Sequence, residues 1–200
     1  MRMLDEILGQ FISVGVIALI IVFQQEIRSF LVMLGKIGTE HNKYFRFLRK
    51  IQNQDNNIDS DSIIESMKNM SKTLTGALIV ITRTNELTEV VETGEEINAK
   101  ISAALIDTIF YKNNPLHDGA IVITNNKIIA ARCVLPVSKS PNIPADYGLR
   151  HRASVGITQN TDSLSIIVSE QTGKYAYSEA GELFTNVSIE DIRKVLEKKE

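Results

Sequence analysis

The chain has 200 residues, of which 44% are hydrophobic and 23% are charged, as is typical of a globular protein with one core. Its 22 basic and 24 acidic residues give a net charge of −2, so no overall positive field favours non-specific binding to nucleic acid. Cys133 is the one cysteine, which excludes an intramolecular disulfide and a zinc site made of several cysteines.

Residues 7–23 form an almost continuous apolar run at the short end of the range for a membrane-spanning helix. Asp5 and Glu6 precede the run, whereas a signal peptide would begin with basic residues. Basic residues outnumber acidic ones over 24–50, which predicts that the following chain is cytoplasmic. We therefore expect a single-pass helix in the cell membrane, with a helix buried in an oligomer core as the alternative.

Residues 52–62 are rich in Asn, Asp, Ser and Gln, a composition that predicts a linker. The expected organisation is a transmembrane and juxtamembrane helix over 1–37, a linker over 38–61 and a globular domain over 62–200. Ser62 and Glu65 have the spacing of a capping box, which predicts a helix over 62–74. The apolar run 76–81 predicts a buried strand, and amphipathic spacing predicts a helix over 99–110.

Further along, two strands are expected over 119–124 and 127–135, joined by a turn at Asn125 and Asn126. Cys133 falls in the second strand and is interpreted as a small core residue rather than a reactive thiol. A helix over 147–158, a hairpin over 163–177 that turns at Gly173, and a final helix capped by Ser188 complete the pattern. Antiparallel strand pairs with helices before and between them predict an α+β fold with a mixed, largely antiparallel sheet flanked by helices.

The sequence Leu-His-Asp-Gly-Ala at 116–120 precedes the strand expected at 119–124. Asp-Gly on its own is most often a simple turn, and a single histidine is most often structural. Together, however, Asp118 offers an oxygen ligand or a base for a hydroxyl, and His117 offers a nitrogen ligand or an acid. Gly119 would let a ligand approach the backbone closely.

Arg150, His151 and Arg152 form a second cluster at the start of the helix expected over 147–158. Arginine forks and the N-terminal end of a helix both favour phosphate, although a solvated charged patch is the alternative. Positions 150 and 152 point to different faces of a helix, so one of the two arginines could serve structure. Glu170 ends an apolar strand and is a weaker candidate for a metal ligand.

The two clusters and Glu170 together indicate phosphoryl or nucleotidyl transfer, which needs cations on the phosphate oxygens, a metal and a group that handles the attacking hydroxyl. Neither a P-loop nor a Gly-x-Gly-x-x-Gly motif occurs, which excludes the common nucleotide-binding folds.

The motifs at 116–120 and 148–153 (Gly-Leu-Arg-His-Arg-Ala), in this order and spacing, resemble the paired signature of diadenylate cyclase domains. The resemblance covers about residues 62–198, and it includes 134–138 and 169–173. Residues 21–28 resemble the end of the last membrane helix in the membrane-anchored class. The long DNA-binding extension of the DNA-scanning class has no counterpart here, so no nucleic-acid partner is expected.

The resemblance implies that two ATP molecules are joined into cyclic di-AMP with release of two pyrophosphates, with Mg²⁺ or Mn²⁺ as cofactor. It implies a homodimer, or a higher oligomer built from it, in which two ATP molecules meet face to face. Asp118 would activate the 3′-hydroxyl or hold the metal, with His117 and Glu170 as further metal ligands. The implied ATP-binding and catalytic residues also include Gly76, Ala77, Gly119, Ala120, Leu135, Gly148, Leu149, Arg150, His151 and Arg152.

Three positions depart from the family pattern. Leu149 stands where many members have Thr, Gln25 replaces a proline that is usual after the membrane helix, and the apolar run has room for one membrane helix where three are usual. These departures keep open a catalytically weak or inactive membrane-bound nucleotide sensor of the same fold. A metal-dependent phosphodiesterase, indicated by the His-Asp pair, ranks last because such enzymes use more ligands than three histidines supply.

Overall fold

The structure is a computed structural model that describes residues 22–23, 58–84, 87–140, 143–144 and 147–198. The chain divides into two compact units, Met1–Asp55 and Asn56–Glu200, and the sheet lies in the second. The membrane helix expected within 1–37 lies outside the described residues apart from Val22 and Phe23. Among the described helices, none combines the length and the hydropathy needed to cross a bilayer.

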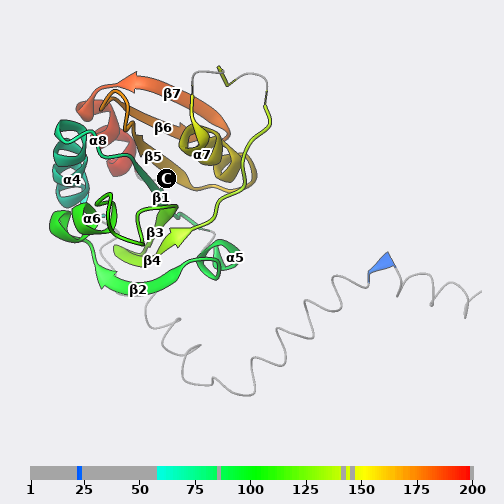
Figure 1. Ribbon diagram of the computed structural model, residues 1–200. Helices are drawn as coiled ribbons and strands as arrows, with labels where there is room; N and C mark the ends of the chain where they lie inside the picture. The colour runs from blue at the N-terminus through cyan, green and yellow to red at the C-terminus, as the bar shows by residue number, and fades with distance from the viewer. Residues whose placement is uncertain (1–21, 24–57, 85–86, 141–142, 145–146, 199–200) are drawn as a thin grey trace, which may run out of the picture. The chain divides into compact units, whose positions relative to one another are not determined.

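A seven-stranded sheet with the order β2-β4-β3-β1-β5-β6-β7 forms the centre of the second unit (Figure 1). The strands are β1 (Ala77–Ile81), β2 (Glu95–Lys100), β3 (Ala120–Thr124), β4 (Lys127–Cys133), β5 (Leu164–Val168), β6 (Tyr175–Glu179) and β7 (Glu182–Val187). β1 and β3 are parallel, and every other neighbouring pair is antiparallel. The predicted mixed, largely antiparallel sheet is confirmed.

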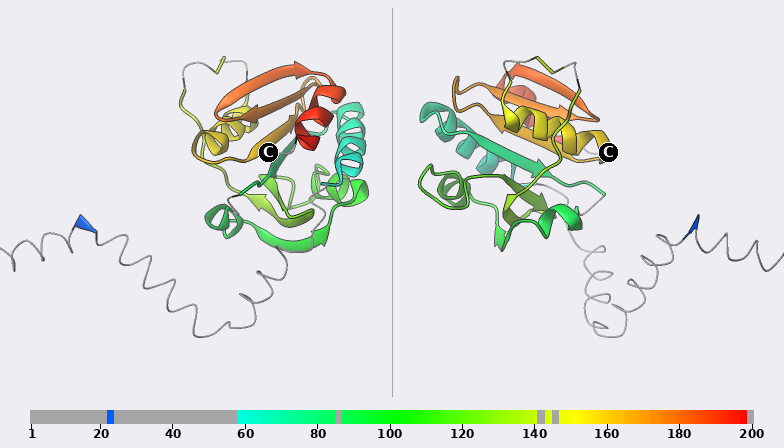
Figure 2. Two further views of the ribbon diagram at one scale, coloured as in Figure 1. Left: turned by 180° about the vertical axis from the view of Figure 1, so that it is seen from behind. Right: turned by 45° about the vertical axis from the view of Figure 1, so that its right-hand side comes forward.

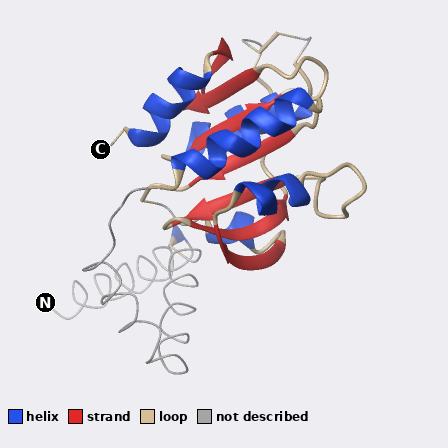
Figure 3. Ribbon diagram, turned by 90° about the vertical axis from the view of Figure 1, so that its left-hand side faces the viewer, coloured by secondary structure: helices blue, strands red, loops and turns tan. Residues whose placement is uncertain are grey.

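Helices cover both faces of the sheet. α4 (Ser60–Lys72), α6 (Ala103–Ile109) and α8 (Ile189–Glu197) lie side by side on one face (Figure 3), and α5 (Thr88–Val91) and α7 (Leu149–Asn160) lie on the other (Figure 2). β1, β3 and β5 are buried at every residue, so their side chains alternate between two apolar clusters. Ile79 and Ile121 pack toward α4, whereas Val80 and Val122 pack toward α7.

The elements that the sequence did not predict lie at the margins of the sheet. β2 and β7 are the two edge strands, and α5 is a single turn before β2. The helix expected over 99–110 is shorter, because Ala99 and Lys100 pair with β4. Ile97, Ala99 and Ile101 are spaced two residues apart, as in a strand. Ile101 and Leu105 are spaced four residues apart, as in a helix, so the apolar spacing alone does not place the boundary between the two elements.

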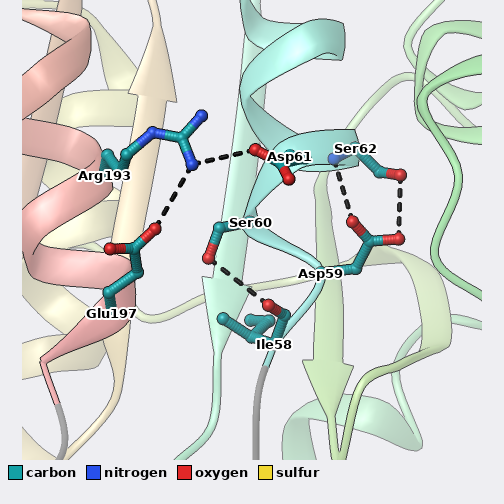
Figure 4. Close-up of polar contacts among 7 residues, drawn as sticks. All are labelled: Ile58, Asp59, Ser60, Asp61, Ser62, Arg193 and Glu197. Atoms are coloured by element: carbon teal, nitrogen blue, oxygen red, sulfur yellow. Dashed lines mark hydrogen bonds and ion pairs between the residues drawn. The ribbon is translucent and has the colours of Figure 1, made fainter.

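α4 begins at Ser60, within the segment expected to be linker, and its N-cap is Asp59 rather than Ser62. The backbone N–H and the hydroxyl of Ser62 donate to the Asp59 carboxylate at 3.0 and 2.9 Å (Figure 4). The capping box predicted for Ser62 and Glu65 is therefore wrong, because an aspartate three residues earlier is the better acceptor at this helix start. The predicted cap of the last helix is confirmed, since Ser188 accepts from the Asp191 N–H at 3.1 Å.

The start of α4 is also tied to two distant elements. The Asp59 N–H donates to the side-chain oxygen of Asn126 at 2.8 Å, and Arg193 of α8 pairs with Asp61 at 2.8 Å (Figure 4). Asn125 and Asn126 have φ values of 51° and 58°, as expected for a tight turn between β3 and β4. The chain thus enters the domain at the hairpin end of β3, opposite to Ala120.

A small group of buried hydroxyls lies between α7 and the sheet. Ser178 of β6 donates to the Ser154 carbonyl at 2.8 Å, its oxygen lies 2.6 Å from the Ser154 hydroxyl, and it accepts from Thr158 at 3.0 Å. Ser165 lies opposite Ser178 in the sheet and is fully buried, yet its hydroxyl has no hydrogen-bond partner among the described residues. The two serines therefore make opposite contributions to stability.

We expect Ser178→Ala to lower the free energy of unfolding by about 1–3 kcal/mol, because it removes a shared partner of two buried hydroxyls. Ser165→Ala should leave stability unchanged or raise it slightly, since no bond among the described residues is lost. Urea unfolding of the full chain followed by circular dichroism measures both variants. Equal destabilisation by the two substitutions would contradict this assignment.

Candidate functional site

Four strand ends meet at one end of the sheet, which we call the cavity edge, as distinct from the edge strands β2 and β7. Ala77 at the start of β1 pairs with Val168 at the end of β5, and Ala120 at the start of β3 pairs with Cys133 at the end of β4. A cavity of about 870 Å³ lies at this edge. The loop before β3, the segment after β4, the first turn of α7 and the turn after β5 contribute to its lining. This arrangement brings the two sequence clusters to one site.

Asn114 shapes the loop that carries Asp118. Its side-chain oxygen accepts from the Leu116 N–H at 2.9 Å, and its carbonyl accepts from the N–H and the ring nitrogen Nδ1 of His117 at 3.2 and 2.6 Å. Such local bonds from Asn to nearby backbone are the reason that Asn favours turns. Asp118 follows this braced turn and is exposed at the rim of the cavity.

Gly119 is required by the sheet itself. Its φ of +134° strains any residue with a side chain, and an added Cβ would lie 2.7 Å from the carbonyl carbon of Arg132 in β4. The glycine was expected to allow a close approach by a ligand. The structure shows that a neighbouring strand makes the close approach, although Gly119 also lines the cavity.

The N-terminal end of α7 borders the cavity. Gly148 is the N-cap without a side-chain bond, and the first turn of a helix leaves N–H groups unpaired, so this end favours an anion. Leu149 has a side chain that is 74% exposed at the rim. Arg150 lines the cavity, whereas Arg152 does not, and the Arg152 carbonyl accepts from the Ser138 N–H at 3.0 Å. Of the two arginines, only Arg150 therefore contributes to the lining of the cavity.

His151 differs from its two arginine neighbours in charge. Its ring is half-buried and packs against Tyr147 with ring centres 4.7 Å apart. Burial lowers the pKa of His151 below its ordinary value of 6.5, because a buried site disfavours the charged ring. At neutral pH the ring is therefore uncharged, and the positive charge of the cluster comes from the arginines.

Arg150 is paired with Glu170 inside the cavity. Nη1 of Arg150 lies 2.7 Å from Oε2 of Glu170, which stands in the turn after β5. Gly76 lies directly beside this pair, since an added Cβ would be 2.6 Å from Nη1. Gly76 is thus placed next to the site, but it does not line the cavity.

Cys133 lines the same cavity but is only 1% exposed. Burial raises the pKa of its thiol to about 11, so the thiol stays protonated at neutral pH. Its interpretation as a core residue is supported by its packing beside Ala120 and Leu135 in the α7-side cluster.

The structure gathers most of the residues expected at the site. Those that line the cavity are Asp118, Gly119, Leu135, Gly148, Leu149, Arg150, His151 and Glu170. Those expected at the site that do not line it are Gly76, Ala77, His117, Ala120 and Arg152. Ala77 and Ala120 are fully buried strand residues, so their place is beneath the site rather than on its surface.

Several residues of the lining were not predicted. They include Tyr147, Lys174 and Tyr175, together with Val134 and Val137. Tyr147 lies close before the second motif, and Lys174 follows the turn glycine Gly173 after Glu170. Val134 and Val137 lie in the segment 134–138 that the resemblance included, whereas proximity to the motifs was the only signal for Tyr147, Lys174 and Tyr175.

The donor set suits a hard divalent cation. Asp118 and Glu170 line one cavity, and Mg²⁺ is commonly held by one or two carboxylates completed by substrate phosphates. No group of three potential metal ligands occurs within the described residues. His117 is braced as metal-binding histidines usually are, with Nδ1 against a carbonyl, which leaves Nε2 as its ligand atom. The residues therefore fit Mg²⁺ or Mn²⁺ bound together with a nucleotide.

Comparison with known proteins identifies the family. A family model described as the nucleotide-binding domain of the DisA bacterial checkpoint controller matches residues 64–183. A diadenylate cyclase of Listeria monocytogenes is 40% identical over 196 residues, which cover 98% of this chain and 70% of that protein.

Two solved structures are similar. DacA from Staphylococcus aureus, as a double mutant, matches 68% of this chain and 91% of its own with a TM-score of 0.67 and 39% identity. A hypothetical membrane spanning protein from Bacillus cereus matches 94% of this chain and 99% of its own with a TM-score of 0.63 and 29% identity. The cavity, its two motifs and these similarities together show that the chain belongs to the diadenylate cyclase family.

Proposed function

We propose that this protein condenses two ATP molecules into cyclic di-AMP and releases two pyrophosphates. The observation that carries the proposal is the single cavity that joins the Asp118 loop to the N-terminal end of α7 and Arg150. A carboxylate for the hydroxyl and a cationic helix end for the phosphates are the two groups that this reaction needs. Membership of the family supports the same reaction.

In each of the two transfers, the 3′-oxygen of one ATP forms a bond to the α-phosphorus of the other. The bond from that phosphorus to the oxygen that bridges to the β-phosphate breaks, and the electron pair leaves with pyrophosphate. Asp118 accepts the proton of the 3′-hydroxyl, and Arg150 and the first turn of α7 hold phosphate oxygens. Bound Mg²⁺ or Mn²⁺, held by the cavity carboxylates Asp118 and Glu170 and completed by substrate phosphates, would offset phosphate charge.

Catalysis requires a second copy of the chain, because one cavity holds one of the two ATP molecules. Exposed apolar side chains support a dimer that forms at the cavity edge. Leu74 precedes β1, Tyr111 lies in the segment leading to β3, Val134 and Val137 follow β4, and Leu149 opens α7; each is at least 45% exposed. Val134, Val137 and Leu149 line one cavity, and neighbouring exposed apolar residues of this kind mark protein interfaces.

Attachment to the membrane is the remaining part of the proposal. The apolar run 7–23 and the basic residues over 24–50 support a single membrane helix followed by a cytoplasmic catalytic domain. The similarity to a protein from Bacillus cereus described as membrane spanning is consistent with this location.

Asp118→Asn should reduce cyclic di-AMP formation by about 10²-fold or more, because the amide cannot accept the hydroxyl proton. ATP binding should persist, since the phosphate-holding groups are intact. Product formation with ATP and Mn²⁺ is measured by mass spectrometry. Asp61→Asn on α4 is the control, as this aspartate lies at the hairpin end of the sheet. Unchanged turnover in Asp118→Asn would refute the role, and wild-type binding without any product would favour the nucleotide sensor.

Val134→Glu should weaken dimerisation and reduce product formation. The physical reason is that a charge buried in an apolar interface is costly. Sedimentation of the full chain in detergent measures the oligomeric state. Lys100→Glu, which changes an exposed charge at the opposite end of the sheet, should leave both properties as they are. A fully dimeric and active Val134→Glu variant would place the interface elsewhere.

The full chain should remain with carbonate-washed membranes when expressed in a bacterium. Ile17→Lys combined with Ile20→Lys should release it, because each lysine at a helix centre costs about 2.5–3.5 kcal/mol on insertion. Ile17→Leu combined with Ile20→Leu is the matched control and should stay with the membrane. Release of the unmodified chain by carbonate would exclude a spanning helix.

A further inference from the structure

The Arg150–Glu170 ion pair occupies the place where the proposed reaction needs both residues for other partners. Arg150 is the cavity arginine at the phosphate-favouring end of α7, and Glu170 is one of two carboxylates in the lining. Their 2.7 Å contact joins α7 to the turn after β5. The carboxylate that the proposed reaction assigns to a metal thus contacts the guanidinium that it assigns to phosphate.

Gly76 leaves the space that this ion pair occupies. An added Cβ would lie 2.6 Å from Nη1 of Arg150 and 3.0 Å from both Cβ and Oε2 of Glu170. Gly76 does not have a positive φ, so the absence of a side chain serves space rather than backbone conformation. The pair therefore rests on bare backbone just before β1, with the Arg150 side chain 26% exposed and the Glu170 side chain 54% exposed.

The charges of the cavity lining determine how the ion pair affects the binding of a triphosphate. Among the described residues of the lining, Arg150 and Lys174 are the cations, Asp118 and Glu170 are the carboxylates, and His151 is uncharged at neutral pH. These four charges cancel, so the lining by itself is a poor partner for a polyanionic triphosphate. A divalent cation that binds Glu170 adds positive charge and also releases Arg150.

We propose that the Arg150–Glu170 ion pair on Gly76 is an internal lock that makes metal binding and nucleotide binding depend on each other. The inference rests on the proposed function, because it assigns Glu170 to the metal and Arg150 to phosphate. A metal that draws Glu170 away frees Arg150 for the nucleotide, and a phosphate that draws Arg150 away frees Glu170 for the metal. By thermodynamic linkage the two ligands strengthen each other by the same factor.

Affinities for ATP are measured by calorimetry on the full chain in detergent, with EDTA and therefore without turnover. The non-cleavable analogue α,β-methylene-ATP is then measured both with EDTA and with Mn²⁺. In the wild-type protein Mn²⁺ should tighten binding of the analogue. Glu170→Gln should tighten metal-free binding by about fivefold, the low end of typical coupling between sites, and should reduce the gain from Mn²⁺.

Glu170→Asp separates the lock from a simple effect of charge. It keeps the negative charge but is one methylene group shorter, so it cannot hold Arg150 in the same contact. A lock predicts that this variant also binds ATP more tightly in EDTA than the wild type does. Wild-type affinity in Glu170→Asp, with tighter binding only in Glu170→Gln, would reduce the effect to charge and overturn the lock.

Glu179→Gln is the matched control, because it removes the same charge from a glutamate outside the cavity lining. Glu179 ends β6 and pairs with Arg83 and Lys198. It should change neither metal-free affinity nor the gain from Mn²⁺. Product formation from ATP and Mn²⁺ is assayed separately. If the wild type forms cyclic di-AMP but Glu170→Gln binds ATP in EDTA no more tightly than the wild type, the lock is overturned and the proposed reaction stands. If Glu170→Gln binds ATP more tightly in EDTA but the wild type forms no product, the proposed reaction is overturned and the lock stands.

Discussion

The pairing of β1 between β3 and β5 is the constraint on which the site depends. β1 runs parallel to β3 and antiparallel to β5, so the starts of β1 and β3 and the end of β5 fall on one edge. Gly76 directly precedes β1, whereas one residue separates Asp118 from the start of β3 and one separates Glu170 from the end of β5. A slip of one residue in either pairing would turn every side chain of a strand to the opposite face. The register is held because each covered face is closely packed with its own set of side chains.

Electrostatics at this edge are balanced rather than uniformly positive. Burial keeps His151 neutral, and Glu170 compensates Arg150. The attraction for phosphate in the protein therefore comes mainly from the first turn of α7. The N–H groups of this turn are neutral dipoles, so no carboxylate is needed to balance them. A balanced lining also avoids the repulsion that bare adjacent cations would impose on the folded domain. Such a site favours a ligand that arrives with its own cation.

The central part of the fold could be predicted from the sequence, and its margins could not. Continuous apolar runs identified β1, β3 and β5, and the turn residues Asn125, Asn126 and Gly173 placed the hairpins. Edge strands such as β7 alternate between exposed and half-buried residues, which makes a weak signal. The two motifs located the site, but pairing of Arg150 with Glu170 and the neutral state of His151 depend on packing between distant segments, which spacing does not reveal.

The bond from the Asp59 N–H to Asn126 has a mechanical consequence. Tension applied to the chain before Asp59 would enter the domain through α4 and the β3–β4 turn, at the end of β3 opposite to the cavity. β3 is flanked by β1 and β4, so the load would be shared along two ladders of hydrogen bonds instead of peeling an edge strand. The cavity, which lies at the other end of β3, is thereby insulated from strain that enters at Asp59.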